Sequence, residues 1–428
     1  MSCTHDQRAL RAGFFVDIDE AEKELNAAID LLSPETRGGI TERNIVSRFS
    51  TGLNVRSGEA ETPVVHVFNF NDSLGFAILS GDRRIEPIIC ITEKGHLEPD
   101  SVIDNPGMVI FLSNMDTYYR IKTGLPVLDE DGNEIIIEDP TPQRFLPDTT
   151  SDIVVTYEYG PWTVASSVGT ILPCQWGQGD PYGYCFNTEC YTSDGQRAWA
   201  GCGPVAVGQI MYYWGKDYSD GQVSLDWDSM HTVYNQFDWT IIGRQKVGQL
   251  IHLLGSPSNM NATYGPVTDS TGTSTTLESI PQTFLNFGYS SGGVIQDYSF
   301  SAVSSGLFTG PVLGSGCSHK TIHRQYLLGL LVNSWETFSG GHAWVFDQAQ
   351  VWQRTVTEYH DEIFDHSFSE NDWVLHINWG WDGEYDGYFS AFDFNINLPK
   401  TRSVTEETIG IDGLYQFRLK VITGICAQ

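Results

Sequence analysis

One cysteine in this sequence stands where a thiol could act as a nucleophile. Cys202 lies between two glycines, is followed by Pro204, and begins an apolar segment that continues to Trp214. Proline is favoured in the first turn of a helix, so this pattern predicts that Cys202 begins a buried helix. The unpaired backbone N–H groups and the dipole at a helix N-terminus stabilise a thiolate, which is the nucleophilic form of cysteine. The sequence therefore indicates Cys202 as a candidate nucleophile.

Three other segments contain side chains that could support such a nucleophile. Gln178 lies in a turn-rich loop upstream, where its amide could either donate to a developing oxyanion or simply bridge the loop. His342 follows two glycines at the expected start of a strand, and glycines allow another backbone to approach closely. Asn378 and Trp379 end a second expected strand. There an amide can fix the tautomer of an imidazole while the indole excludes water.

The cysteines and histidines do not form a recognisable metal site. The spacings of Cys174, Cys185 and Cys190 do not repeat a zinc-ribbon pair, and His319 and His323 lack a third ligand nearby. We therefore expect no metal ion and no cofactor. Eight cysteines are too sparse for a disulfide scaffold in a chain of 428 residues. Whether Cys174, Cys185 and Cys190 form a disulfide stays open.

Charge and hydropathy exclude two kinds of partner. The chain has 24 basic and 54 acidic residues, and its formal net charge of −30 argues against binding to nucleic acid or an anionic membrane surface. No apolar run approaches the roughly 18–20 residues that span a bilayer, so we expect no transmembrane segment. The opening Met1-Ser2-Cys3 is typical of a bacterial lipoprotein site, although an ordinary start codon explains it as well. From it we expect export and a lipid anchor at Cys3.

The composition divides the chain into two domains near residue 150. Residues 129–165 are acidic, contain prolines and lack periodic apolar positions, as linkers do. Residues 1–150 then form a smaller α+β domain with its linker, and residues 151–428 form the second domain. In the first domain we expect a helix over 17–32 capped by Asp17 or Asp19, three strands at 64–70, 74–79 and 85–91, and a helix over 102–121.

The second domain contains further expected elements. Apolar periodicity predicts helices over 247–254 and 277–287. Residues 348–372, between the strands that contain His342 and Asn378, are rich in charged side chains and are predicted to form a solvated loop.

Taken with Cys202, His342 and Asn378, these patterns resemble the streptopain family of bacterial cysteine peptidases, a branch of the papain-like fold. The resemblance covers residues from about 165 to 395, and its motifs fall in the family's order. They are Trp176-Gly177-Gln178 with Pro181-Tyr182, Gly201-Cys202 with Gln209 to Trp214, Gly341-His342-Ala343, and Asn378 to Trp381 with Asp386 to Phe389. The first third, notably Gly75 to Asp82, is similar to the family's inhibitory propeptide.

The resemblance implies a fold and a role for each candidate residue. The fold would be α+β, with a papain-like peptidase domain built of a helical part and an antiparallel sheet, preceded by a smaller α+β prodomain. Cys202 would be the nucleophile and His342 its general base and acid. Gln178 would be an oxyanion donor, and Asn378 with Trp379 would orient the histidine.

The sequence departs from the family pattern at three places. Gly203-Pro204-Val205 replaces the common Val-Ala-Thr, Asp382 stands where glycine is frequent, and the segment 348–372 is long. These departures bear on substrate preference more than on activity.

The resulting prediction is the zymogen of a cysteine endopeptidase that forms an acyl-enzyme. Its partners would be protein or peptide substrates and its own prodomain, which inhibits until it is cleaved off. The protein would be exported by a bacterium, either secreted or held as an outer-surface or periplasmic lipoprotein. Two alternatives stay open, namely an amidase or transferase acting on a non-protein amide, and a catalytically inactive binding homologue.

Overall fold

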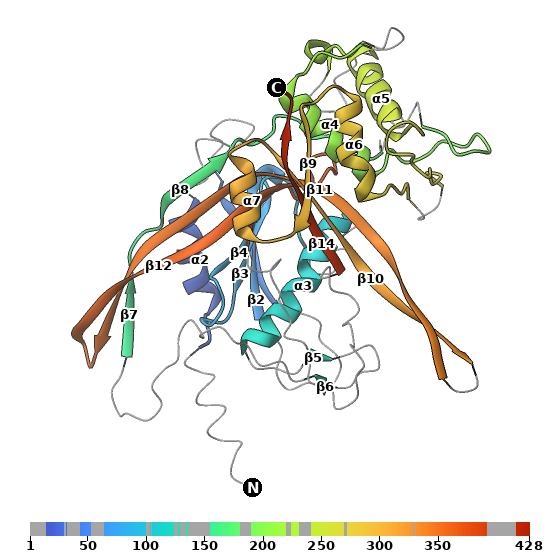
Figure 1. The fold of residues 1–428 in the computed structure, drawn as a ribbon. Coiled ribbons are helices and arrows are strands. Elements are labelled where there is room, and N and C mark those ends of the chain that lie inside the picture. Colours follow the sequence, from blue (N-terminus) through green and yellow to red (C-terminus); the bar gives the residue numbers. More distant parts are fainter. Residues whose placement is uncertain are drawn as a thin grey trace.

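One large antiparallel sheet joins the two predicted domains. The structure is a computed structural model that describes residues 14–29, 31, 43–52, 64–99, 103, 105–123, 127–128, 134–135, 155–179, 190–219, 224–230, 241–268, 272–327, 330–391 and 417–428. Within these residues, 12 strands form the sheet, in the order β1-β2-β3-β4-β13-β12-β11-β10-β14-β9, with β7 and β8 also paired to β11 (Figure 1). The predicted boundary near residue 150 lies outside the described residues.

The N-terminal part is the predicted small α+β unit. Its elements are α2 (Ile18–Ile29), β1 (Ile45–Gly52), β2 (Val64–Phe70), η2 (Asn71–Ser73), β3 (Phe76–Ser80), β4 (Ile88–Thr92), α3 (Pro106–Thr123), β5 (Val127–Leu128) and β6 (Glu134–Ile135). The meander of β2, β3 and β4 is confirmed, as are both helices. Asp17 is the residue that caps α2, because its carboxylate accepts hydrogen bonds from the backbone N–H groups of Asp19 and Glu20 at 3.0 and 2.9 Å.

The C-terminal part combines a helical layer with the longest strands of the sheet. Its elements are β7 (Val155–Tyr159), β8 (Thr163–Gly169), α4 (Cys202–Trp214), η4 (Trp227–Ser229), α5 (Ile241–Gly255), η5 (Leu277–Ser279), α6 (Ile280–Asn286), β9 (Ser291–Asp297), α7 (Phe300–Leu307), β10 (Val312–Leu327), β11 (Leu330–His360), β12 (Ile363–Asn378), β13 (Gly387–Ser390) and β14 (Phe417–Cys426). The helices predicted over 247–254 and 277–287 are confirmed within α5 and within η5 and α6. This mixture of helices and antiparallel strands matches the predicted fold class.

Two predictions for this part were wrong. Residues 348–372 are not a loop, because they form the long hairpin of β11 and β12, paired from Val345 and Asn378 to His360 and Ile363. Residues 361–369, at the turn and the start of β12, are mostly exposed, so this part of the hairpin carries polar side chains of the kind that suggested a loop. The linker predicted over 129–165 is also too long. Strand β7 lies inside this range and β8 crosses its C-terminal end, and both strands pair with β11.

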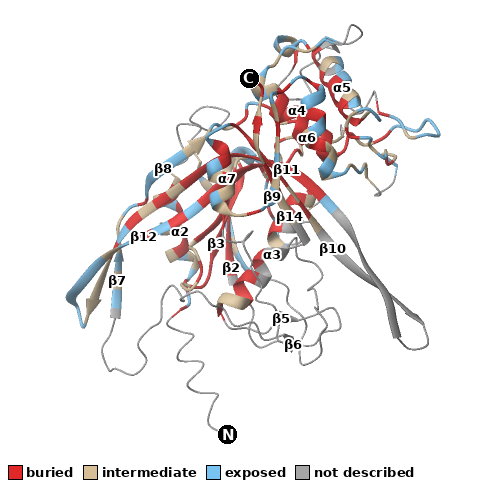
Figure 2. Cartoon of the chain, viewed as in Figure 1, coloured by how far each residue is buried: buried red, intermediate tan, exposed pale blue. Residues whose placement is uncertain are grey.

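The two faces of β11 carry different cores. Side chains alternate along a strand, so Ala343 and Val345 face α4, whereas Trp344 and Phe346 face α3 and the N-terminal strands. Figure 2 shows that the buried residues concentrate where these layers meet. At Gly107 in α3, an added Cβ would lie 2.1 Å from a ring carbon of Trp379, so glycine is needed for this close approach.

The N-terminal part completes the edge of the C-terminal sheet. Strand β4 pairs antiparallel with β13, and the backbone N–H of Glu93 donates to the carbonyl of Asp386 at 2.7 Å. Beside this edge, the fully buried imidazole of His376 lies 2.5 Å from an Asp347 oxygen and 3.3 Å from a Glu93 oxygen. Burial alone would lower the pKa of His376, but Asp347 and Glu93 outweigh it and raise the pKa to about 10. A charged imidazole thus bridges the two parts.

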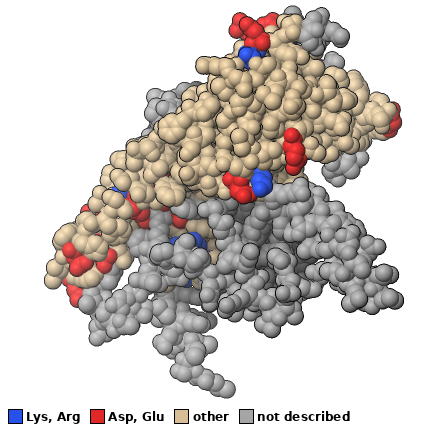
Figure 3. Space-filling model, viewed as in Figure 1, with Lys and Arg blue, Asp and Glu red and all other residues tan. Residues whose placement is uncertain are grey.

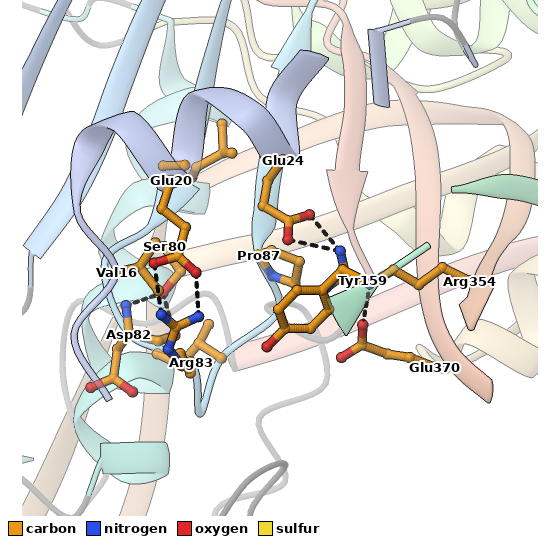
Figure 4. Close-up of a pocket in the computed structure, with 13 residues that line it drawn as sticks. Val16, Glu20, Glu24, Ser80, Asp82, Arg83, Pro87, Tyr159, Arg354 and Glu370 are labelled. Carbon is orange, nitrogen blue, oxygen red and sulfur yellow. Dashed lines mark hydrogen bonds and ion pairs between the residues drawn. The ribbon is translucent and has the colours of Figure 1, made fainter. Parts of the chain in front are cut away.

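A second buried cation joins them near the middle of the hairpin (Figure 4). Arg354 of β11 donates to the carboxylate of Glu24 in α2 at 2.8 and 2.6 Å, and also bonds Glu370 of β12. Its guanidinium lies 4.3 Å from the ring centroids of both Tyr159 and Trp162. Burial would lower the pKa of Arg354, but the two carboxylates raise it, so the charge is held by contacts from both parts.

On the face shown in Figure 3 most of the described side chains are uncharged, and no described helix is suited to a membrane. On the face shown in Figure 3, the few described basic side chains lie beside acidic ones. Among the described residues, none of the helices combines the length and the apolar character needed to cross a bilayer.

We predict that Arg354→Met destabilises the whole chain by about 3–5 kcal/mol, because it leaves the carboxylates of Glu24 and Glu370 buried without their cation. The measurement is the free energy of unfolding in urea. Arg83→Met is the matched control, since Arg83 pairs with Glu20 at a more exposed position and its loss should cost about 0–1 kcal/mol. Equal losses in the two variants would contradict this account of the interface.

Candidate active site

The structure confirms that Cys202 begins a buried helix. Helix α4 starts at Cys202, and every residue from Gly203 to Met211 is buried. Gly201 precedes the helix with a φ of 89°, a conformation that favours glycine, and Gly215 ends it in the left-handed region. The glycine before the cysteine and the proline after it therefore have the local roles that the sequence suggested.

The thiol of Cys202 is not activated in this conformation. Burial raises the pKa of the thiol, and this outweighs the backbone N–H groups of Ala343, Gly203 and Cys202, which lower it. In the full chain, burial thus opposes the thiolate form expected at the helix N-terminus. The backbone N–H groups at the helix terminus lower the thiol pKa, as predicted, but removal of water from around the sulfur raises it by more.

Whereas Cys202 is half-buried, His342 is buried. Its Nε2 lies 2.9 Å from the backbone carbonyl oxygen of Trp379, and its ring stacks on Trp344 at a centroid distance of 6.2 Å. The side chain lies on strand β11 with 3% of the residue exposed. Burial lowers the pKa of His342 to about 4, although the hydrogen bond to Trp379 acts in the opposite direction.

Cys202 and His342 are neighbours in space but lie on opposite faces of β11. The thiol lies against the backbone of Ala343, on the face that packs on α4. The imidazole of the preceding residue points to the other face, with Trp344 and Trp379. Among the described residues, no hydrogen bond joins the thiol to the imidazole. Proton transfer between them requires the imidazole to change faces.

The loop that contains Gln178 lies beside the start of α4. The carbonyl of Gln178 accepts a hydrogen bond from the backbone N–H of Ala200 at 3.0 Å, two residues before Cys202. A Cβ at Gly179 would lie 2.1 Å from the ring of Trp199, and one at Gly177 would lie 2.4 Å from a carboxylate oxygen of Asp382. The glycines thus let this loop approach both Trp199 and the turn that contains Asp382.

The structure gives Asn378 partners other than the one expected. Its Oδ1 accepts hydrogen bonds from Gly380 N–H at 3.0 Å and from the Gln209 amide at 3.2 Å. Its Nδ2 donates to the carbonyl of Cys174 at 2.8 Å. Because these bonds occupy the amide, Asn378 does not orient His342 in this conformation. The predicted contact between Trp379 and His342 is present, but it is made through the Trp379 carbonyl and the ring faces.

Gln209 and Asp386 were named as members of the family motifs, but sequence reasoning gave neither of them a role in holding this region together. Gln209 is fully buried within α4 and bonds Asn378 and the backbone of Trp176. Asp386 is fully buried and accepts the backbone N–H of Trp379 at 2.8 Å. An amide within an otherwise apolar helix, as at Gln209, is the signal that could have been used.

Two of the three cysteines considered for a disulfide lie among the described residues. Cys174 and Cys190 are buried thiols that are not joined to each other, whereas Cys185 and Cys3 lie outside the described residues.

At the turn of the β11–β12 hairpin, Glu358, Asp365 and His366 bring potential ligand atoms within 4.8 Å of one another. Asp365 and His366 are exposed and already hydrogen bonded to each other at 2.6 Å, and we assign this cluster no role.

Comparison with known proteins identifies both parts of the chain. Residues 176–389 match the model of the peptidase C10 family, and residues 15–119 match the Spi protease inhibitor model. The chain is 26% identical over 385 residues to thiol protease/hemagglutinin PrtT of Porphyromonas gingivalis. That alignment covers 86% of this chain but only 38% of the relative, so the chain spans well under half of that protein's length.

A solved structure gives a further match. A fragment of prointerpain A from Prevotella intermedia is 17% identical, and the alignment covers 88% of this chain and 98% of the fragment at a TM-score of 0.49. The family assignment does not depend on it, since the C10 model alone covers half of the chain, from Trp176 to Phe389. The chain belongs to the peptidase C10 family of cysteine peptidases and has a propeptide inhibitor domain at its N-terminal end.

Proposed function

We propose that this chain is a cysteine endopeptidase zymogen in which Cys202 is the nucleophile and His342 the general base and acid. The observation that carries the proposal is the position of the Cys202 thiol. It lies at the N-terminus of α4 and against the backbone of Ala343, one residue from the imidazole that must take its proton. A change of face by His342, at the strand position next to Ala343, therefore separates the present arrangement from a reactive pair.

The reaction can proceed once the His342 imidazole lies on the face of β11 that packs on α4, next to the Cys202 thiol. His342 removes the thiol proton, and the thiolate attacks the carbonyl carbon of the scissile peptide bond. The backbone N–H of Cys202 and the Gln178 amide donate to the oxyanion that forms. Collapse of this intermediate expels the amine, which takes the proton from His342. Water, deprotonated by His342, then attacks the thioester, the C–S bond breaks, and the acid product leaves as the Cys202 sulfur regains a proton from His342.

The contacts of the N-terminal part support its role as the inhibitor of the same chain. Helix α3 packs against Trp379 through Gly107, and Trp379 holds the imidazole on the wrong face for catalysis. Strand β4 occupies the edge of β13, and Glu93 pairs with His376 two residues before Asn378. We propose that removal of residues 1–150 frees the turn around Trp379 and lets His342 turn toward Cys202.

The cleavage site and the location of the protein complete the proposal. We place processing in the segment between β6 and β7, so that the peptidase domain begins near residue 151. Export by a bacterium, with Cys3 as a lipid attachment site, is supported by the local sequence pattern Met1-Ser2-Cys3. The substrates would be proteins or peptides.

We predict that Cys202→Ala abolishes both casein hydrolysis and self-processing. The purified chain, incubated alone or with trypsin, should yield a fragment that starts near residue 151, hydrolyses casein and is inactivated by a thiol alkylator. Loss of the nucleophile should lower kcat on the order of 10⁶-fold, which is below detection. Cys426→Ala, which changes a thiol near the C-terminus, is the matched control and should keep activity. Equal turnover by the Cys202→Ala fragment would overturn the assignment.

We predict that acid weakens the latent conformation between about pH 6.5 and 4. Burial holds the pKa of His342 at about 4, below its unfolded value of about 6.5, so this stabilisation is present above pH 6.5 and is lost as the pH falls through 4. Burial also lowers the pKa of His66, which adds in the same direction. His376, with a pKa of about 10, stays charged throughout this window and contributes no change.

The measurement is the free energy of unfolding in urea at several pH values, on a Cys202→Ala background that prevents cleavage. Adding His342→Asn should flatten the loss of stability between pH 6.5 and 4. His252→Gln, at an exposed position, should keep the original profile. An unchanged slope in the His342→Asn variant would show that this imidazole is not buried in the uncharged form.

A further inference from the structure

Gln209 connects three segments of the proposed site through one side chain. Its Oε1 accepts a hydrogen bond from the backbone N–H of Trp176 at 3.2 Å, and its Nε2 donates to Asn378 Oδ1 at 3.2 Å. The residue has no exposed surface. A buried amide stabilises the fold only when its polar atoms find partners, so both contacts constrain where Trp176 and Asn378 can lie.

Gln209 and Cys202 lie on the same face of α4. Seven residues separate the two, which is nearly two full turns, so their side chains leave the helix in almost the same direction about 10 Å apart. The segment on the other side of the amide is Trp176-Gly177-Gln178, which contains the proposed oxyanion donor. The Gln178 carbonyl is held near the start of α4 by the Ala200 N–H, and the Gln209–Trp176 hydrogen bond is a second contact that fixes the distance from Cys202 to this loop.

Asn378, which bonds Gln209, also bonds the loop that contains Trp176. Its Nδ2 bonds the carbonyl of Cys174, two residues before Trp176, and its Oδ1 also accepts from Gly380 N–H. The loop is thus held at Cys174 by Asn378 and at Trp176 by Gln209. None of these bonds involves a residue of the N-terminal part, so they can persist after the prodomain is removed.

We propose that Gln209 is a positioning residue that holds the Gln178 loop at the distance from Cys202 that oxyanion stabilisation requires. The proposal rests on the function proposed above. It predicts that losing the Gln209 bonds lowers the rate of chemistry while substrate binding and thiol reactivity stay largely unchanged. Misplacement of a catalytic donor by about 1 Å can reduce a rate by about 100-fold.

The test uses the processed, active enzyme and the variant Gln209→Met, which keeps the length of the side chain but makes neither hydrogen bond. We expect kcat for a peptide substrate to fall about 10- to 100-fold, with KM changed less than about twofold. Affinity for a peptide aldehyde should fall in parallel, because the bound hemithioacetal has an oxygen at the oxyanion position. The rate of alkylation by iodoacetamide should stay near that of the wild type.

A second variant keeps the proposal testable if Gln209→Met folds poorly. In Gln209→Glu a neutral carboxylic acid can both accept from Trp176 N–H and donate to Asn378, whereas a carboxylate cannot donate. The ratio of its kcat to that of the wild type should therefore rise as the pH falls. Gln350→Met is the matched control, since Gln350 is a buried amide bonded to Gln348 and Trp352 in the hairpin, and its kcat should be unchanged.

Three results would overturn the proposal. They are an unchanged kcat and aldehyde affinity in Gln209→Met, a fall in its alkylation rate equal to the fall in kcat, and a pH-independent kcat ratio for Gln209→Glu. An inactive wild-type fragment would instead contradict the proposed function itself, so the two failures are distinguishable.

Discussion

The alternation of side chains along strand β11 is the constraint on which the latent state depends. A strand presents successive residues to opposite faces, so a histidine beside Ala343 cannot share the face of Ala343 unless the local backbone changes. Here Ala343 contacts the Cys202 thiol, while His342 stacks among tryptophans on the opposite face. A nucleophile and its base can therefore be adjacent and yet unable to exchange a proton.

Burial reinforces this separation electrostatically. It raises the pKa of the Cys202 thiol and lowers that of the His342 imidazole, so both groups are neutral near pH 7. A reactive thiolate–imidazolium pair requires the opposite shifts, which arise when the two groups contact each other. The N-terminal part packs α3 on Trp379, which contacts His342, and it holds its position with two buried cations, His376 and Arg354, each paired with one of its own carboxylates.

The sequence predicted the features that local chemistry determines. The glycine and proline around Cys202 indicated the start of α4, and Asp17 indicated the cap of α2. The strands of the N-terminal meander followed from turn residues between apolar runs. Strand pairing between distant segments could not be predicted. Nothing in the residues from 348 to 372 indicated that β11 and β12 continue as a hairpin, or that β11 pairs with β7 and β8. The partners of Asn378 were missed for the same reason, because Gln209 and Cys174 are distant in sequence.

The activation proposed above requires that His342 changes faces when the N-terminal part is removed. The most direct measurement is a crystal structure of the processed enzyme, compared with one of the full chain carrying Cys202→Ala. The account predicts that in the processed enzyme the imidazole lies on the α4 face within hydrogen-bond distance of the Cys202 thiol, no longer bonded to the Trp379 carbonyl. An imidazole that remains stacked on Trp344 in an active, processed enzyme would contradict it.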